Sequence, residues 1–494
     1  MAVQSVPSKK VLIQENLPVA AVSGLAEAIE RYYVTPNNSY VEPGSYRRIE
    51  SGGVIELSWR FRYTEGPVIV PLAVDLSISQ EAVELSFLDL NRDDPAQVKF
   101  SSRVIDDIQN IVWQYMQNTK LSSLYFVIGG SEERHSEAPG QRDSTVRNIL
   151  RRLFSGNTTN VYLTFLFFSF ILFFIIGVYT VFVLIALQLV YLIFADKIAM
   201  NLGSVHPTAE NPLVTIVSVR SNRETLKALS SYAKKIMPEI RDEIMKSIQV
   251  PTTATERASV KASVMGILSR HGVHVNLNDI EIKTRNVYAI VGRVAARFHR
   301  DPPGIVIANS LVSNAAATGI STKHSSIMIT AGSLDDLNED ELEAVIGHEL
   351  GHIKGHDPVL LFAVTSFEFY GRFFLWFPLF LFQPLLYFVV VFGAIFAFGK
   401  VLETRADTES AIVMGNPASM ASALTKIGLR QLYHERYSPG AKVLDWFQFD
   451  PHPPIYFRVG RMSEFESPNR APINHAFWIS LRDCIVGFLA AFRG

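Results

Sequence analysis

The feature that most constrains the fold of this chain is an uncharged stretch at residues 153–195. Its apolar part, residues 161–195, is 35 residues long, whereas one helical membrane span needs about 20 residues. The length favours a helical hairpin of two short spans that turns near Gly177 over a single long tilted helix. We therefore expect an integral membrane protein.

A second apolar block, residues 358–401, is interrupted by Pro378 and Pro384 and predicts another hairpin, which makes about four spans in all. Its first half contains Glu368 and Arg372, which are costly in lipid unless they pair. The two residues are four apart, so on a helix they lie on one face and are expected to form an ion pair.

Composition supports a membrane protein and narrows the chemistry. Hydrophobic residues make up 48% of the chain, and the net charge of −1 gives no indication of nucleic-acid binding. The single cysteine, Cys484, excludes an intramolecular disulfide and a cysteine-based metal site. No cleavable signal peptide is recognisable in the polar residues 1–14.

One short motif points to metal chemistry. His348 and His352 are four apart, so a helix places both imidazoles on one face, where they can bind one Zn²⁺ ion. Glu349 follows the first histidine and can act as a base on water. Such a string also occurs by chance, so a third ligand is needed. Glu403 is the candidate, and Asp407, one turn later, can hydrogen-bond a ligand imidazole.

The order of these motifs resembles that of the M48 metallopeptidases. HELGH, an apolar hairpin, ETRAD and then His452-Pro453-Pro454 with Arg458 are most similar to the HtpX-like membrane proteases, with the Ste24 prenyl-protein proteases as relatives. The resemblance covers roughly residues 201–461 and leaves the part before about residue 150 unexplained. It implies a zincin-like protease with one Zn²⁺ per chain that degrades misfolded or damaged membrane proteins.

The resemblance also implies roles for further residues. His452 corresponds to a late histidine near the metal, which could stabilise the oxyanion. Arg458 either holds the loop of His452 or forms a surface salt bridge. His356 is left out of the site, because Pro358 is expected to end the helix there. A small-residue segment matches a family segment and is expected to receive substrate as an edge strand. It consists of Asn314, Ala315, Ala316, Ala317 and Thr318.

The predicted fold class is a soluble α+β N-terminal domain followed by a mainly α-helical membrane zincin-like domain with a small sheet. The expected divisions are an accessory domain (1–128), a linker (129–158), a first hairpin (159–196), a first protease part (197–357), a second hairpin (358–401) and a second protease part (402–494). In the accessory domain, residues 54–63 alternate like a half-buried strand. In the protease part, residues 287–294, 304–307 and 326–330 are predicted strands, and residues 332–338 a turn.

Basic residues flank both apolar blocks at their outer ends, and the expected turns between the spans carry none. By the positive-inside rule, the soluble parts and the catalytic site face the cytoplasm. The flanking residues are Arg147, Arg151, Arg152, Lys197, Lys354, Lys400 and Arg405.

The leading function is a zinc endopeptidase whose partners are the lipid bilayer and polypeptide substrates. A Ste24-like protease of prenylated C-termini and a non-catalytic membrane scaffold are the alternatives. The sequence names neither the natural substrate, nor the ligand of the N-terminal domain, nor the oligomeric state.

Overall fold

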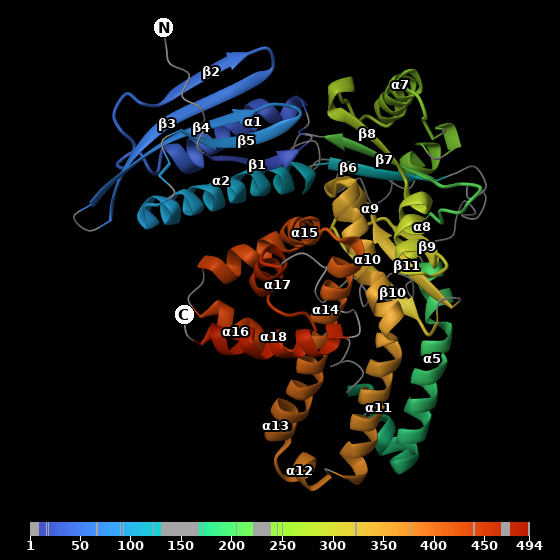
Figure 1. Ribbon diagram of the computed structural model, residues 1–494. Coiled ribbons are helices and arrows are strands. Elements are labelled where there is room, and N and C mark those ends of the chain that lie inside the picture. Colours follow the sequence, from blue (N-terminus) through green and yellow to red (C-terminus); the bar gives the residue numbers. More distant parts are fainter. Residues whose placement is uncertain are drawn as a thin grey trace. The chain divides into compact units, whose positions relative to one another are not determined.

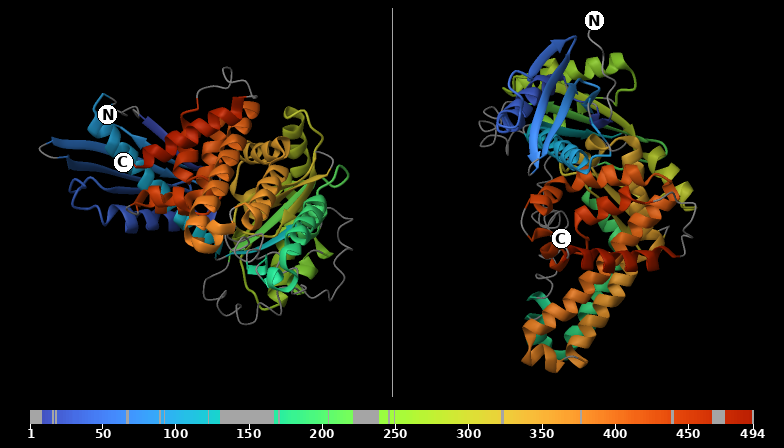
Figure 2. Two further views of the ribbon diagram at one scale, coloured as in Figure 1. Left: turned by 90° about the horizontal axis from the view of Figure 1, so that it is seen from below. Right: turned by 60° about the vertical axis from the view of Figure 1, so that its left-hand side comes forward.

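The computed structural model describes residues 9–129, 167–220, 239–465 and 475–492, with gaps of one or two residues inside these ranges (Figures 1 and 2). The chain forms two compact units. Unit 1 contains Met1–Tyr125, Val217–Ile244 and Thr255–Ile282, and unit 2 contains Phe126–Ile216, Met245–Ala254 and Lys283–Gly494. A three-stranded sheet has the order β6-β7-β8, and its strands are Ser123–Ile128, Leu213–Arg220 and Ile280–Asn286. The domain boundaries expected from the sequence stay a prediction.

Unit 1 is built on a five-stranded antiparallel sheet of order β1-β5-β4-β3-β2, with helices α1 and α2 packed against it. The strands are β1 Lys9–Glu15, β2 Arg47–Ser51, β3 Val54–Glu65, β4 Val68–Ile78 and β5 Ala82–Phe87, and the helices are α1 Val19–Ile29, the π-helical turn η1 Glu30–Val34, α2 Pro95–Leu121 and, later in the chain, α7 Ala254–Arg270 with the 3-10 turn η4 Leu277–Asp279.

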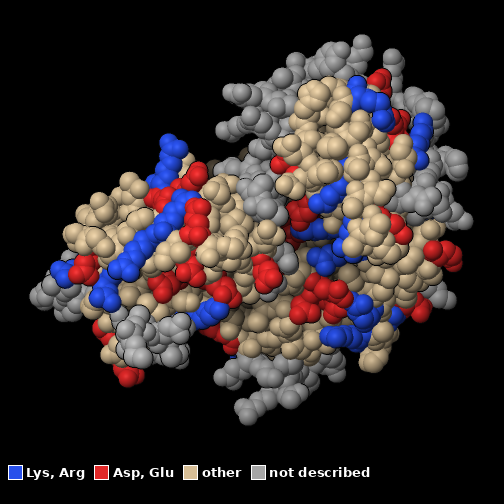
Figure 3. Space-filling view, turned by 90° about the horizontal axis from the view of Figure 1, so that it is seen from above, with Lys and Arg blue, Asp and Glu red and all other residues tan. Residues whose placement is uncertain are grey.

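The predicted strand over residues 54–63 is confirmed by β3. Its apolar residues Leu57, Trp59 and Phe61 are buried, whereas the intervening Glu56 and Arg60 are exposed. The side chains of the outer face are of both signs, and Arg62 pairs with Glu42, which lies in the segment before β2. In Figure 3, basic and acidic side chains lie next to one another on the visible surface. This mixed surface agrees with a net charge close to zero.

Unit 2 contains a small sheet of order β10-β11-β9, in which β9 runs parallel and β10 antiparallel to β11. Strand β10 is therefore an edge strand. The strands are β9 Gly304–Ala308, β10 Ala315–Gly319 and β11 Ser325–Thr330. The helices of this unit are α5 Thr180–Leu202, α8 Val287–Arg297, α9 Ala331–Asp336, α10 Glu339–Gly355, α11 Asp357–Phe374, α12 Phe377–Phe382, α13 Pro384–Tyr387, the π-helical segment η5 Phe388–Phe392, α14 Gly393–Met414, α15 Pro417–Tyr437, α16 Ala441–Phe447, α17 Ile455–Ser463 and α18 Ala476–Ala491.

Two local predictions in this unit are wrong. Residues 287–294 form helix α8 rather than a strand, because Asn286 caps the helix by accepting from the backbone N–H of Ala289. Its buried residues recur at helical spacing: Val287, Ile290, Val291, Val294 and Ala295. The expected turn at residues 332–338 is largely the short helix α9, capped by Thr330.

The apolar helices α5, α11 and α14 of unit 2 pack side by side, as Figures 1 and 2 show. In the described chain, two helices are long and apolar enough to cross a membrane, Phe167–Asn201 and Pro384–Met414. The first contains a 3-10 turn at Gly177–Tyr179, where Gly177 has a φ of +62°. This break lies where the first hairpin was expected to turn. The hairpin itself stays a prediction, because residues 161–166 lie outside the described ranges.

The expected ion pair in α11 is confirmed. Arg372 donates to both carboxylate oxygens of Glu368 at 2.9–3.0 Å, and Tyr387 donates to the same carboxylate. All three side chains are buried, so the two charges in this apolar region neutralise each other.

Candidate metal centre

Helix α10 begins and ends with clear signals. Asn338 caps it by accepting from the backbone N–H of Glu341, whose carboxylate accepts from Asn338 in return. The helix ends at Gly355, and His356 takes the left-handed conformation, with φ 54° and ψ 36°. Between these ends the helix is regular, and it places His348 and His352 on one face.

Helix α14 lies close against α10, because small residues face each other. An added Cβ at Gly347 would lie 2.7 Å from the Ser410 hydroxyl, and one at Gly351 would lie 3.2 Å from Ala406. Ser410 also donates to the carbonyl of Ala344 at 2.8 Å. This close packing brings a side chain from the second half of the chain, 51 residues beyond His352, next to the histidines.

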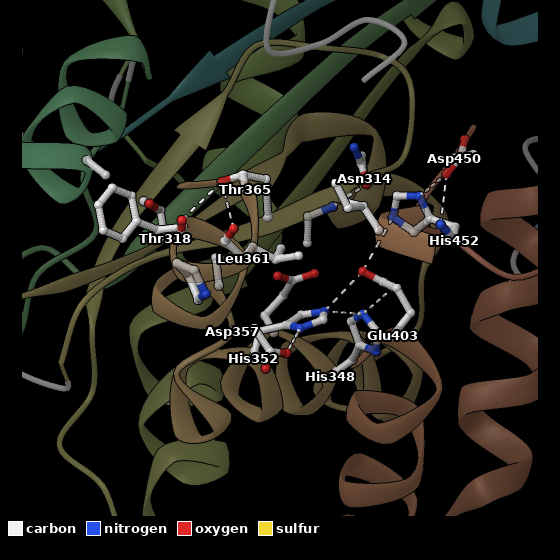
Figure 4. Close-up of a pocket in the computed structure, with 18 of the residues that line it drawn as sticks. Asn314, Thr318, His348, His352, Asp357, Leu361, Thr365, Glu403, Asp450 and His452 are labelled. Carbon is white, nitrogen blue, oxygen red and sulfur yellow. Dashed lines mark hydrogen bonds and ion pairs between the residues drawn. The ribbon is translucent and has the colours of Figure 1, made fainter. Parts of the chain in front are cut away.

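That side chain is Glu403, and with the two histidines it forms a cluster whose donor atoms all lie within 4.8 Å of one another (Figure 4). The Nε2 atoms of His348 and His352 are 3.1 Å apart. The Glu403 carboxylate lies 3.4 Å from the first Nε2 and 3.3 Å from the second. Donors bound at about 2.0–2.1 Å to a tetrahedral zinc ion would be roughly 3.3 Å apart, so these spacings suit one ion.

The protonation of the two rings supports the same conclusion. His348 Nδ1 lies 2.8 Å from a carboxylate oxygen of Asp407, and His352 Nδ1 lies 2.6 Å from one of Asp357. The hydrogen bond with Asp357 holds the proton on Nδ1 of His352, and the nearby charge of Asp407 favours the same tautomer in His348, so that each Nε2 keeps a lone pair. Two lone pairs then face each other, with a Glu403 oxygen that is buried and has no hydrogen-bond partner. A proton shared by the two Nε2 atoms or a metal ion bound between all three groups removes the repulsion, and the donor set of two imidazoles and a carboxylate fits a metal ion.

The electrostatic field around the rings also favours a cation. Burial acts to lower the pKa of His352, but the charge of Glu403 and the hydrogen bond with Asp357 outweigh it, so the pKa lies well above 6.5. Burial also acts to lower the pKa of His348, but the hydrogen bonds with Asp407 and Glu403 outweigh it, so this pKa is raised as well. The carboxylates around the rings therefore create a negative field that favours a cation, and a bound metal ion would displace the protons from the Nε2 atoms.

Asp407 and Arg458 form the second layer of the site. Arg458 donates to both oxygens of Asp407 at 2.8 Å, and its guanidinium lies 3.7 Å from Glu403. Both residues are buried, with exposed fractions of 8% for Arg458 and 1% for Asp407. Arg458 is therefore an internal partner of the carboxylate behind His348 and forms no surface salt bridge.

His452 lies at the open side of the site. Its Nε2 is 3.7 Å from Glu403, and its Nδ1 is 2.7 Å from Asp450. The charge of Glu403 raises the pKa of His452 against the effect of burial, and Asp450 adds to the rise. About half of the side chain is exposed, so His452 can approach a bound molecule.

A cavity of about 1000 Å³ connects these residues, and it lies entirely within unit 2. It is lined by His348, Glu349, His352, Glu403, His452 and Arg458, and also by residues 314–318. Every site residue predicted from the sequence lines this cavity except Asp407, which lies behind His348. The cavity continues between the apolar helices α5 and α11, as far as Glu368 and Arg372.

Two contacts were not foreseen. Asp357 faces His352, and Lys400 donates to the backbone carbonyls of Gln448 and Asp450, so it fixes the loop before His452. The only sequence signal for Asp357 is an acidic residue directly after the expected helix end. The partners of Lys400 are 48 and 50 residues away, which no local pattern reveals.

Residues 281–466 match Peptidase family M48. The chain carries an M48 peptidase domain. The resemblance to HtpX-like proteases is confirmed by curated relatives of this M48 domain. They include a Protease HtpX homolog of Moorella thermoacetica, 32% identical over 161 residues (28% of this chain and 54% of that protein), and Protease HtpX of Legionella pneumophila strain Corby, 32% identical over 172 residues (31% and 60%). The Protease HtpX homolog of Pyrococcus furiosus is 29% identical over 213 residues (37% and 74%).

The chain thus spans about half to three quarters of the length of these relatives. Among solved structures, the crystal structure of S. mikatae Ste24p is similar with a TM-score of 0.27 and 14% identity, over 48% of this chain and 64% of that one. A likeness this weak decides nothing about the present fold.

Proposed function

We propose that this protein is a membrane-embedded zinc endopeptidase that cleaves misfolded or damaged membrane proteins. One observation carries the proposal. Two imidazole lone pairs and a carboxylate oxygen converge on one point, beside a glutamate and inside a cavity. His348, His352 and Glu403 would hold one Zn²⁺ per chain, which leaves a coordination position open.

When bound, zinc would supply a Lewis acid that polarises a peptide carbonyl and makes water easier to deprotonate. The chain's own residues would do the rest. Glu349 follows His348 on α10 and lines the cavity. It would accept a proton from the attacking water and then deliver it to the leaving amine nitrogen. Asp407 would hold the proton on Nδ1 of His348, so that Nε2 keeps its lone pair.

The open side of the site would bind the peptide. His452 is exposed and close to Glu403, so it could donate to the oxyanion that forms at the scissile carbonyl. Residues 314–318 lie on the edge strand β10 and line the same cavity. The edge of β10 that does not pair with β11 could pair with an extended substrate, and the small alanine side chains would allow a close approach.

The part of the cavity that lies between α5 and α11 supports membrane proteins as the substrates. The space beside the metal cluster continues between apolar helices, which would accept apolar side chains on one side of the scissile bond. We place the protein in the cell membrane as a multi-pass protein, with the catalytic side in the cytoplasm, on the evidence of the apolar helices and the basic residues beside them.

Metal analysis combined with a proteolysis assay tests the proposal. The detergent-purified protein is expected to contain one zinc per chain and to digest unfolded casein and an unfolded membrane protein. A chelator should abolish both digestions, and added zinc should restore them. Protein that is folded but binds no zinc would support the scaffold instead. Zinc-loaded protein that cuts only prenylated peptides would support the Ste24-like alternative.

A further inference from the structure

The junction between α10 and α11 returns an acidic side chain to the metal centre. Because His356 is left-handed, the chain turns sharply after Gly355, and Asp357 becomes the first residue of α11. Its carboxylate oxygen Oδ2 lies 2.6 Å from Nδ1 of His352. Asp357 is only 3% exposed, so this contact is shielded from water.

Arg405 fixes this carboxylate from the other side. One guanidinium nitrogen of Arg405 lies 2.8 Å from Oδ1 and 2.7 Å from Oδ2 of Asp357, and it also donates to the carbonyl of Gly351 at 3.3 Å. Arg405 is 7% exposed. An added Cβ at Gly355 would lie 1.9–2.2 Å from the guanidinium, so glycine leaves the space that Arg405 occupies.

We propose that Asp357, held by Arg405, is the positioning residue of His352: it keeps the proton on Nδ1 and orients the ring so that Nε2 faces the metal. The proposal rests on the zinc site proposed above. Its physical basis is that a carboxylate behind a ligand imidazole fixes the ring and makes the ligand more basic. Each histidine ligand then has its own arginine–carboxylate support, Arg458 with Asp407 for one and Arg405 with Asp357 for the other.

In this arrangement, both α14 and α11 contribute residues that position His352. Helix α14 carries the third ligand and, two residues on, the arginine that supports the second histidine through Asp357. Helix α11 begins at Asp357 and runs on through the apolar region. A displacement of α11 would therefore move Asp357 and with it the ring of His352.

Zinc affinity tests the proposal in the full chain, with Glu349→Gln as background to prevent self-digestion. Asp357→Asn keeps the side chain's size and removes its charge, and should weaken zinc binding about 10–100-fold in a chelator competition. The matched control is Asp335→Asn, because Asp335 is also a carboxylate with little exposure that pairs with a lysine, Lys283, at 2.7 Å, and is not a residue that lines the cavity. The control should bind zinc like the background protein.

A second readout separates positioning from general destabilisation. With saturating Co²⁺ in place of zinc, the visible absorption reports ligand geometry; it should change in Asp357→Asn and stay unchanged in Asp335→Asn. Arg405→Lys leaves Asp357 in place and keeps the positive charge, but it removes the guanidinium nitrogen that contacts both carboxylate oxygens. It should weaken zinc binding less than Asp357→Asn, and it serves as the test if that variant does not fold.

Two results would overturn the inference. One is an unchanged cobalt spectrum with zinc affinity within threefold of the background in Asp357→Asn, or in Arg405→Lys if only that variant folds. The other is an equal loss of affinity in Asp335→Asn. If the background protein itself binds no zinc, the proposed function fails along with the inference, whereas failure of Asp357 alone leaves the zinc site standing.

Discussion

Replacing Asp407 by asparagine should separate two roles of this buried carboxylate. Asp407 lies 2.8 Å from Nδ1 of His348 and accepts two hydrogen bonds from Arg458. Loss of the charge should lower zinc affinity about 10–100-fold, which is roughly 1.4–2.7 kcal/mol. It also leaves a buried guanidinium without its partner, which typically costs about 3–5 kcal/mol of stability. At about 2–4 °C for each kcal/mol, the apparent melting temperature should fall by roughly 6–20 °C.

The control is Glu341→Gln. Glu341 is 2% exposed, lies on the same helix as the histidines and pairs with Lys426 at 2.6 Å, but it is not part of the metal cluster. The Glu341→Gln substitution should lower the melting temperature by a similar amount and leave zinc affinity unchanged. Isothermal titration or chelator competition on the folded fraction gives the affinity, and a thermal shift assay gives the stability. Equal zinc affinities in the two variants would refute the assignment of Asp407.

Four further outcomes are expected. Glu349→Gln should keep its zinc and lose about 10²–10⁴-fold in kcat; cleavage of casein at the parental rate would exclude Glu349 as the base. Glu403→Ala should lose zinc on dialysis, and retention of parental affinity would mean that the third ligand is another residue. Ala315→Pro and Ala316→Pro are compared because successive N–H groups of an edge strand point to opposite sides. The variant that loses the outward N–H should lower kcat/KM for peptide cleavage without loss of zinc, and equal kcat/KM in both would argue against pairing along β10. Burial raises the pKa of Glu435 to about 7 against two backbone hydrogen bonds, and Asp445 adds to the rise. Since this pKa lies above the unfolded value of 4.5, the stability gained from the proton is complete below pH 4.5 and is lost as the pH rises through 7. The melting temperature should fall between pH 5 and 8, and less so in Glu435→Gln; an identical slope in both proteins would contradict this.

The sequence alone determined the elements whose cause is local. Alternation of apolar and polar residues predicted strand β3, and a polar cap with helical spacing predicted helix α10. The two residues of the ion pair in α11 are four apart on one helix, so their contact also follows from the sequence. The same local reasoning failed at residues 287–294. Their apolar residues suit both a short buried strand and a helix face, and the cap at Asn286 decided between the two.

The candidate site likewise combines features that local sequence determines with features that depend on packing. The histidine pair is fixed by helical periodicity, and Glu403 could be named from a motif. Their convergence to within 4.8 Å depends on how closely α10 and α14 pack, which Gly347 and Gly351 permit.

Only the tertiary structure decided the supports of the site. Asp357 reaches His352 because His356 adopts a left-handed conformation, Arg405 reaches Asp357 across 48 residues, and Lys400 reaches the loop of His452 across 48–50. The physical reason is that a hydrogen bond depends on distance and direction in space. Sequence periodicity defines these only within one helix or strand, whereas contacts between elements are set by the packing of the whole core.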